Sequence, residues 1–122
     1  MIGDKTKSIY LASPYTHEDP AVVLQRHHDV CKVAGELIKQ RKVVFCPIAH
    51  THAVADICDM HSAWGKMWST QDLYWVERCD EFGIVMLDGW SRSKGVAAES
   101  EHAIILGKPI FYIRPGPFLE TD

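Results

Sequence analysis

The chain has 122 residues, of which 47% are hydrophobic and 24% charged, a composition typical of one globular domain that buries a core. The formal net charge is −3 and lysine and arginine form no cluster, which argues against electrostatic binding of nucleic acid. No apolar run reaches the length of a membrane span, and the N-terminus lacks a signal-peptide core. The four cysteines are widely separated without a C-x-x-C pair, which favours a reducing, cytoplasmic setting. We expect a single domain over residues 1–122.

The first third of the chain alternates strand and helix patterns. An apolar run at residues 8–12 predicts a strand. Asp19-Pro20 is typical of a helix N-terminus, and apolar residues recur at helical spacing over residues 20–40. Residues 42–46 predict a second strand. A strand, a long helix and a strand in this order indicate a right-handed crossover within a parallel sheet.

The middle of the chain, residues 47–69, follows no single pattern. Residues 48–58 are compatible with a short helix, and the residues around 61–65 resemble a loop. An irregular stretch of this length is often a lid or a binding loop. The next helix is expected to begin at Ser69 or Thr70, or sooner, near Ser62, and to run to residue 79.

Three further elements complete the pattern: a strand at 82–87, a helix at 96–106 and a strand at 109–113. Four or five parallel strands alternating with helices predict an open α/β fold of the flavodoxin- or Rossmann-like type. Ligands of such sheets bind at the carboxyl ends of the strands. We therefore expect the loops that follow the first, third and fourth strands to be neighbours around one site.

The segment 91–99 combines a possible anion site with a carboxylate. It places serines and a glycine between a strand and a helix, so that hydroxyls and backbone N–H groups meet at a helix N-terminus. Glu99 lies about one turn into that helix, near the loop. A carboxylate beside an anion site is unusual for a purely structural turn, and it is the first indication of catalysis.

Three motifs carry a family resemblance. They are Ile9-Tyr-Leu-Ala-Ser-Pro14, then Asp72-Leu-Tyr-Trp-Val76 followed by Asp80, and Ser93-Lys-Gly-Val-Ala-Ala-Glu99 followed by Ala103 and Gly-Lys-Pro109. They resemble the opening strand, the D-L-x-W-(L/V) helix and the S-x-G-V-x-x-E segment of the nucleoside 2-deoxyribosyltransferases and the related deoxynucleoside 5′-monophosphate N-glycosidases. The resemblance covers roughly residues 8–15 and 70–113.

The resemblance implies cleavage or transfer at the N-glycosidic bond of a (deoxy)nucleoside or its 5′-monophosphate. Glu99 matches the nucleophile that attacks C1′, and Tyr10 matches the tyrosine that supports this glutamate by hydrogen bonding. Asp72 matches an aspartate of the sugar and base pocket, a candidate proton donor to the departing base. Such a pair of carboxyls suits an oxocarbenium-like transition state, as in retaining glycosidases.

The resemblance also implies a set of substrate-binding residues: Ser13, Pro14, Tyr15, Ser93 and Gly95. The nucleoside-using transferases carry an aspartate at the position of Ser93, so this serine favours a phosphorylated substrate. Ser13 replaces the usual glycine of the family. The arginine-bearing loop of the monophosphate enzymes is absent after Tyr15, where only His17 and Arg26 are near in sequence.

Each of these residues also has a purely structural interpretation. Glu99 could be a first-turn acid favoured by the helix dipole, and Asp72 a helix cap or a surface acid. Tyr10 could belong to the core, and Ser93 with Gly95 could form an ordinary turn. Two other classes of function therefore stay open: a nucleotide- or ligand-binding module without turnover, and a flavin-binding protein of the flavodoxin type.

Histidines and aspartates gather between residues 50 and 61 without the specific spacing of a metal site: His50, His52, Asp56, Asp59 and His61. We expect exposed histidines, or histidines that contact substrate, and neither a metal nor another cofactor. Among the tryptophans, Trp75 is expected to pack a helix, whereas Trp64, Trp68 or Trp90 could stack a nucleobase.

The expected partner is a small-molecule nucleoside or nucleotide, with no nucleic acid and no membrane. Because a chain of this length offers a shallow cleft, and because members of the resembled family complete theirs with a neighbouring subunit, we also expect a homo-oligomer, a dimer or larger. Apolar side chains from residues 47–78 are expected in its interface.

Overall fold

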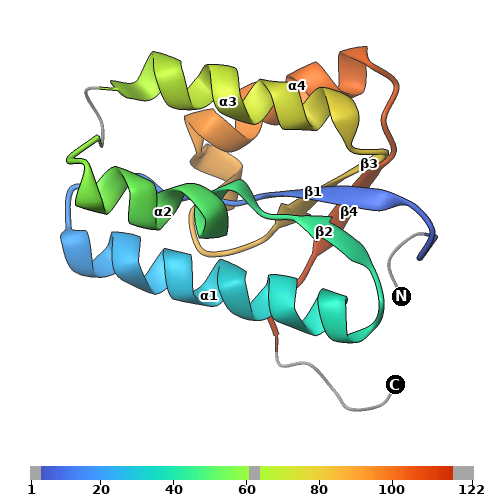
Figure 1. Cartoon of the computed structure of the whole chain (residues 1–122), viewed down its shortest axis with the longest axis horizontal. Helices are drawn as coiled ribbons and strands as arrows, with labels where there is room; N and C mark the ends of the chain where they lie inside the picture. Colours follow the sequence, from blue (N-terminus) through green and yellow to red (C-terminus); the bar gives the residue numbers. More distant parts are fainter. Residues whose placement is uncertain (1–3, 61–63, 117–122) are drawn as a thin grey trace.

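Four parallel strands form the centre of the protein. They are β1 (Ser8–Ala12), β2 (Val43–Phe45), β3 (Glu81–Val85) and β4 (Ile110–Ile113), in the order β2-β1-β3-β4. The computed structural model describes residues 4–60 and 64–116 of the chain (Figure 1). The sheet confirms the predicted open α/β fold and gives it four strands within the described residues, all paired in parallel.

Helices cover both faces of this sheet (Figure 1). They are α1 (Pro20–Lys39), α2 (Pro47–Ile57), α3 (Gly65–Arg78) and α4 (Lys94–Ile105), with a short helix η2 (Trp90–Arg92) before α4. α1 and α2 lie on one side, and α3 and α4 lie on the other. None of the helices in the described residues is long and apolar enough to cross a membrane.

The alternation of side chains along β1 divides the core into two layers. Ile9 and Leu11 point towards α1, whereas Tyr10 and Ala12 point towards α3 and α4. All four are at most 1% exposed, as expected for a central parallel strand covered on both faces. A Cβ at Gly83 on the neighbouring β3 would lie 2.7 Å from Ile113 Cδ1, so a larger residue there would require the Ile113 side chain to move.

The helix boundaries agree with the sequence where capping residues mark them. Asp19 caps α1 by accepting a hydrogen bond from the Ala21 N–H at 2.9 Å, as predicted. Ser93 caps α4, which therefore begins two residues before the predicted start at 96. Of the two predicted starts of the next helix, the cap at Ser69 or Thr70 is wrong, because α3 begins at Gly65, closer to the earlier alternative near Ser62. The Thr70 hydroxyl instead donates to the Lys66 carbonyl inside the helix, at 3.0 Å.

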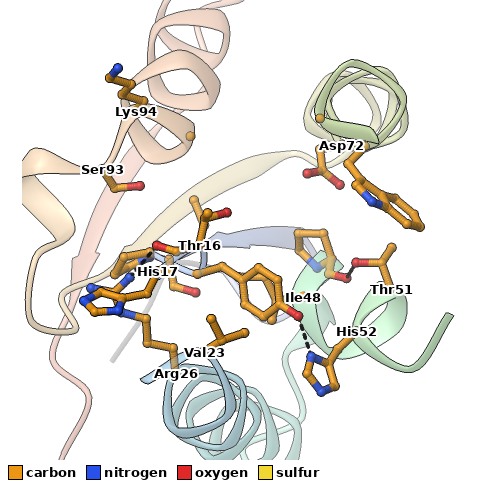
Figure 2. Close-up of a pocket in the computed structure, with 18 of the residues that line it drawn as sticks. Thr16, His17, Val23, Arg26, Ile48, Thr51, His52, Asp72, Ser93 and Lys94 are labelled. Carbon is orange, nitrogen blue, oxygen red and sulfur yellow. Dashed lines mark hydrogen bonds between the residues drawn. The ribbon is translucent and has the colours of Figure 1, made fainter. Parts of the chain in front are cut away.

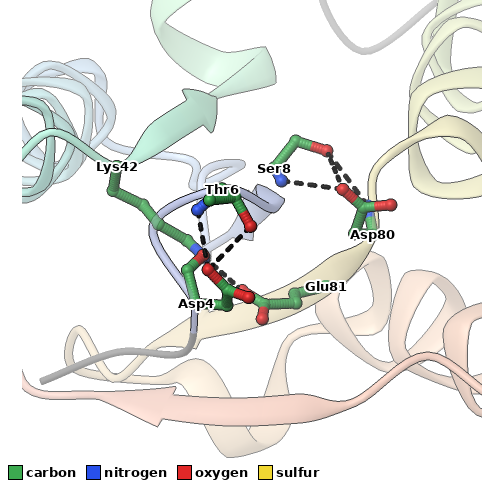
Figure 3. A network of polar contacts seen from close by, with 6 residues as sticks. All are labelled: Asp4, Thr6, Ser8, Lys42, Asp80 and Glu81. Carbon is green, nitrogen blue, oxygen red and sulfur yellow. Dashed lines mark hydrogen bonds and ion pairs between the residues drawn. The ribbon is translucent and has the colours of Figure 1, made fainter.

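A polar network fixes the N-terminal ends of the strands, away from their carboxyl ends (Figure 3). The Lys42 ammonium, 4% exposed as a residue, donates to the Glu81 carboxylate and to the Asp4 carbonyl. Asp80, which matched the family motif, accepts hydrogen bonds from the Ser8 N–H at 2.9 Å and the Ser8 hydroxyl at 3.2 Å. Asp80 therefore joins β1 to the segment before β3, and it does not line the cleft described next.

Candidate active site

A cleft of about 1350 Å³ opens at the carboxyl ends of β1 and β3. The chain leaves β1 towards β2 and leaves β3 towards β4, so the crevice lies where the strand order reverses. Its walls come from the loop after β1, from α1, α2 and α3, and from the loop and helix after β3. The expectation that the loop after the fourth strand takes part is wrong for this cleft, because no described residue after β4 lines it and α2, which follows β2, supplies the third wall.

Asp72 of α3 and Glu99 of α4 both line this cleft, and their carboxyls interact directly. Burial raises the pKa of Glu99 to about 8, and the charge of Asp72 adds to this rise. Burial also raises the pKa of Asp72 to about 6, against a smaller opposing effect of its hydrogen bonding with Glu99. Because two such close groups titrate as a pair, the pair holds one proton near neutral pH.

Tyr10 lies beneath the carboxyl pair and is not part of the cleft wall. Its side chain is fully buried and stacks on Phe82 with 5.5 Å between ring centroids. Burial and the charges of Glu99 and Asp72 raise its pKa, and the approach of its hydroxyl lowers the pKa of Glu99. The hydroxyl is close to Glu99 without the geometry of a full hydrogen bond, and it has no other partner among the described residues.

Ser93 and Gly95 form the opposite end of the cleft at the N-terminus of α4. The Ser93 side chain accepts a hydrogen bond from the Val96 N–H at 3.2 Å, so its own hydroxyl proton can still be donated to a ligand. In Figure 2 this hydroxyl points into the cleft, whereas the Lys94 side chain extends away from it. The first-turn N–H groups of a helix favour an anion at this position.

Arg26 of α1 connects the two loops at this end. Its guanidinium donates to the Thr16 carbonyl at 3.0 Å and to the Asp88 carbonyl at 3.3 Å. Gly89, with φ at +91°, leaves room for it, because a Cβ there would lie 3.0 Å from Arg26 Nη2. A guanidinium carries five N–H donors, so donors remain for a ligand in the cleft. Arg92 lines the same end.

The loop after β1 supplies Ser13, Pro14 and Tyr15 to the lining of the cleft. The Ser13 side chain is 8% exposed as a residue, and its hydroxyl has no hydrogen-bond partner among the described residues. The Tyr15 hydroxyl is hydrogen-bonded to His52 Nδ1 of α2 (Figure 2). The His52 ring stacks on His27 of α1 with 4.0 Å between centroids, which fixes Tyr15 against two helices.

The described histidines between residues 50 and 61 lie in different environments. His52 lines the cleft, whereas His50 is exposed and packs beside Phe45 with 6.1 Å between centroids. His61 lies outside the described residues. Within residues 4–60 and 64–116, no group of three histidine, cysteine, aspartate or glutamate side chains is arranged to hold a metal ion.

The sequence pattern predicted residues at both ends of the cleft but not the arginine that joins the two loops at the Ser93 end. Arg26 was noted only because it is near the first loop in sequence. The available signal was its helix face, since Pro20 and Val23 of α1 also line the cleft. Arg92, between the third strand and Ser93, had no signal beyond its charge.

Comparison with known proteins supports the fold. A family model described as a domain of unknown function (DUF1937) matches residues 7–114. A solved 2-deoxyribosyltransferase from the psychrotolerant bacterium Bacillus psychrosaccharolyticus is 24% identical, and the alignment covers 93% of this chain and 77% of that one with a TM-score of 0.65. No protein with a curated description matches the chain significantly. Because the family model spans nearly the whole chain, the protein belongs to the DUF1937 family, which is related to the nucleoside 2-deoxyribosyltransferase-like proteins.

Proposed function

We propose that this protein breaks the N-glycosidic bond of a (deoxy)nucleoside 5′-monophosphate and passes the sugar to water or to a second base. The observation that carries the proposal is the carboxyl pair of Asp72 and Glu99, half-buried in a cleft at the strand ends. Perturbed carboxyls in a cleft are typical of catalytic sites. The solved structure that shares this fold is a 2-deoxyribosyltransferase described as a suitable biocatalyst for nucleoside synthesis.

In the first step, a carboxylate oxygen of Glu99 forms a bond to C1′ while the bond from C1′ to the base nitrogen breaks. The electron pair of that bond goes to the base, and Asp72 gives the base a proton. Free base and a glycosyl ester of Glu99 result. In the second step, water or another base attacks C1′, its proton passes to Asp72, and the Glu99 carboxylate is released.

One shared proton suits this sequence of events. The free pair shares one proton between Glu99 and Asp72, because burial raises the pKa of both carboxyls. Transfer of that proton to Asp72 in the substrate complex would create a nucleophile and an acid together. Tyr10, buried beneath the pair, would then stabilise the ionised Glu99 by donating its hydroxyl proton to it.

The other end of the cleft favours a phosphate group. It combines the N-terminus of α4, the Ser93 hydroxyl and two arginine side chains, Arg26 and Arg92, with one exposed carboxylate, Asp88. Arginine suits phosphate because its planar fork can make two parallel hydrogen bonds. A nucleotide would then place its phosphate against Ser93 and its C1′ at Glu99.

The test of the chemistry is turnover of a panel of deoxynucleoside 5′-monophosphates, read as released base. Glu99→Gln keeps the shape of the side chain and removes the charge that meets the developing cation. We expect kcat and kcat/KM to fall together by about 100- to 1000-fold. With a 2′-fluoro substrate analogue, the wild type should gain mass on the peptide that carries Glu99. Unchanged turnover in Glu99→Gln would refute the mechanism, and binding without turnover in the wild type would indicate a binding module.

The test of the phosphate end compares each monophosphate with its nucleoside. Arg26→Gln should raise KM for the monophosphate by roughly tenfold or more, because a charge-assisted hydrogen bond contributes about 1.5–3 kcal/mol. It should change KM for the nucleoside much less. Lys39→Gln, which removes the same charge from an exposed site on the same helix, is the matched control. Equal effects on both substrates would argue against phosphate recognition by Arg26.

We further propose that the protein acts in the cytoplasm as a homo-oligomer, a dimer or larger, without a metal or another cofactor. The chemistry above needs only carboxyls, a hydroxyl and a bound substrate. Exposed apolar side chains on α2 and α3, among them Val54, Ile57 and Met67, support the oligomer.

A further inference from the structure

Trp68 is the only one of the four tryptophans that lines the cleft. Trp75 stacks on Phe45 with 4.8 Å between ring centroids, which confirms its predicted packing role. Trp90 packs edge-on against Tyr112 at 5.7 Å, outside the cleft. Trp64 is 43% exposed at the start of α3 and also lies outside the lining. Trp68 is therefore the one tryptophan whose position allows contact with a ligand in the cleft.

Trp68 belongs to a stripe of α3 that faces the cleft: Gly65, Trp68, Ser69 and Asp72. This spacing is that of one face of a helix, with Trp68 one turn before Asp72. Gly65 on the same face has nothing within 4 Å of where a Cβ would lie, so the cleft is open beside the start of this stripe. A nucleobase whose nitrogen receives a proton from Asp72 would therefore lie beside the Trp68 ring.

The only polar atom of the Trp68 side chain is already engaged. Its Nε1–H donates to the Met60 carbonyl at 2.6 Å. The Met60 N–H in turn donates to the Ala55 carbonyl of α2 at 2.8 Å, so the indole is fixed between α2 and α3. An indole donates one hydrogen bond and accepts none, so the half-buried ring offers a ligand its apolar surface alone.

We infer that Trp68 is the surface on which the nucleobase of the substrate packs, and that it determines affinity for the base but not for the sugar phosphate. This inference rests on the proposed function. The fixed ring suits stacking, which every nucleobase can provide and which a sugar phosphate cannot. Apolar neighbours in the lining, Ile48, Ala55 and Met60, extend the same wall.

The experiment measures binding and not turnover. Glu99→Gln serves as the parent, so that bound nucleotides persist, and Trp68→Ala, Trp68→Phe and Trp64→Ala are added to it singly. Calorimetry then compares four deoxynucleoside 5′-monophosphates with deoxyribose 5-phosphate, which lacks a base. We expect Trp68→Ala to weaken nucleotide binding by about 10- to 100-fold and to leave deoxyribose 5-phosphate nearly unchanged.

Two variants serve as controls. Trp68→Phe retains an aromatic ring and should recover part of the loss, whereas Trp64→Ala, which removes a tryptophan from outside the cleft, should bind as the parent does. Equal losses for nucleotides and deoxyribose 5-phosphate in Trp68→Ala, or no loss, would overturn the inference. If no base-bearing ligand binds the parent, both the inference and the proposed function are wrong. Nucleotide binding that depends on Trp68, without turnover by the wild type, would contradict only the proposed reaction.

Discussion

Asp72 on α3 and Glu99 on α4 lie close enough that the ionisation of one raises the pKa of the other. The two helices belong to different parts of the chain and pack side by side on the same face of the sheet (Figure 1). Their carboxyls meet beside the carboxyl end of β1, with the buried Tyr10 beneath them. This arrangement places two acids with unequal pKa values in one cleft, which is the usual basis for separating a nucleophile from an acid.

The first prediction is a bell-shaped dependence of kcat/KM on pH, with a maximum between pH values of about 6 and 8. Below this window both carboxyls are protonated and the nucleophile is lost. Above it both are ionised and no proton remains for the leaving base. Asp72→Asn leaves Glu99 as the only titrating carboxyl of the pair, so the variant should keep an acidic limb but lose the fall in kcat/KM at high pH, at a lower overall rate. A flat profile over this range would contradict the shared proton.

The second prediction concerns stability. Burial raises the pKa of Glu99 in the folded state to about 8 from 4.5, so the folded state binds this proton more tightly than the unfolded state. The resulting stabilisation is complete below pH 4.5 and is lost as the pH rises through about 8. Glu99→Gln should therefore increase the free energy of unfolding at pH 8 by about 1–2 kcal/mol. The increase should shrink towards pH 5.

Urea unfolding at the two pH values measures this effect. Glu101→Gln, on the exposed side of the same helix, is the matched control and should show no increase. A Glu99→Gln protein that is less stable than the wild type at pH 8 would mean that the carboxylate serves the fold. The structural interpretation of Glu99 as a favourable helix charge would then be the better one.

The sequence predicted those features that depend on neighbouring residues. β1 was predicted to the residue because an apolar run ends at Ser13-Pro14, and α1 because Asp19-Pro20 is a strong start signal. The sequence allowed two starts for α3 because its first turn has no capping side chain. The Trp68 side chain instead donates to the Met60 carbonyl of the preceding segment. The contact of Arg26 with Asp88 joins residues 62 positions apart, which no local pattern can indicate.

In the candidate site, too, local features could be predicted from the sequence, whereas features that depend on distant residues could not. The residue types and spacing of the 93–99 segment indicated an anion loop beside a carboxylate, and the structure places both ends in one cleft. The raised pKa values of Asp72 and Glu99 depend on burial by two helices and could not be read from sequence. The orphan hydroxyl of Ser13, where the resembled family has glycine, likewise became visible only in the fold.

The third prediction concerns the buried ion pair of Lys42 and Glu81 at the far end of the sheet (Figure 3). Both residues are 4% exposed, so loss of one partner leaves a charge in the core. Glu81→Leu should lower the free energy of unfolding by about 3–5 kcal/mol, measured by urea unfolding. The double variant Lys42→Met with Glu81→Leu should recover most of this loss. A single variant as stable as the wild type would show that water reaches the ammonium.

The last prediction concerns assembly. Large apolar side chains on α2 and α3 are exposed, with Val54 at 44%, Ile57 at 83% and Met67 at 57%. Exposed apolar side chains gathered on neighbouring elements often mark a protein interface. We expect light scattering at micromolar concentration to give at least a dimer, and Ile57→Asp to shift it towards the monomer. Ile105→Asp, at a site 75% exposed near the end of α4, should leave the assembly unchanged.

Because α2 and α3 also form cleft walls, Ile57→Asp should raise KM for the nucleotide as the protein dissociates. A wild-type protein that is monomeric and fully active at micromolar concentration would refute this interface, and the cleft would then be complete within one chain.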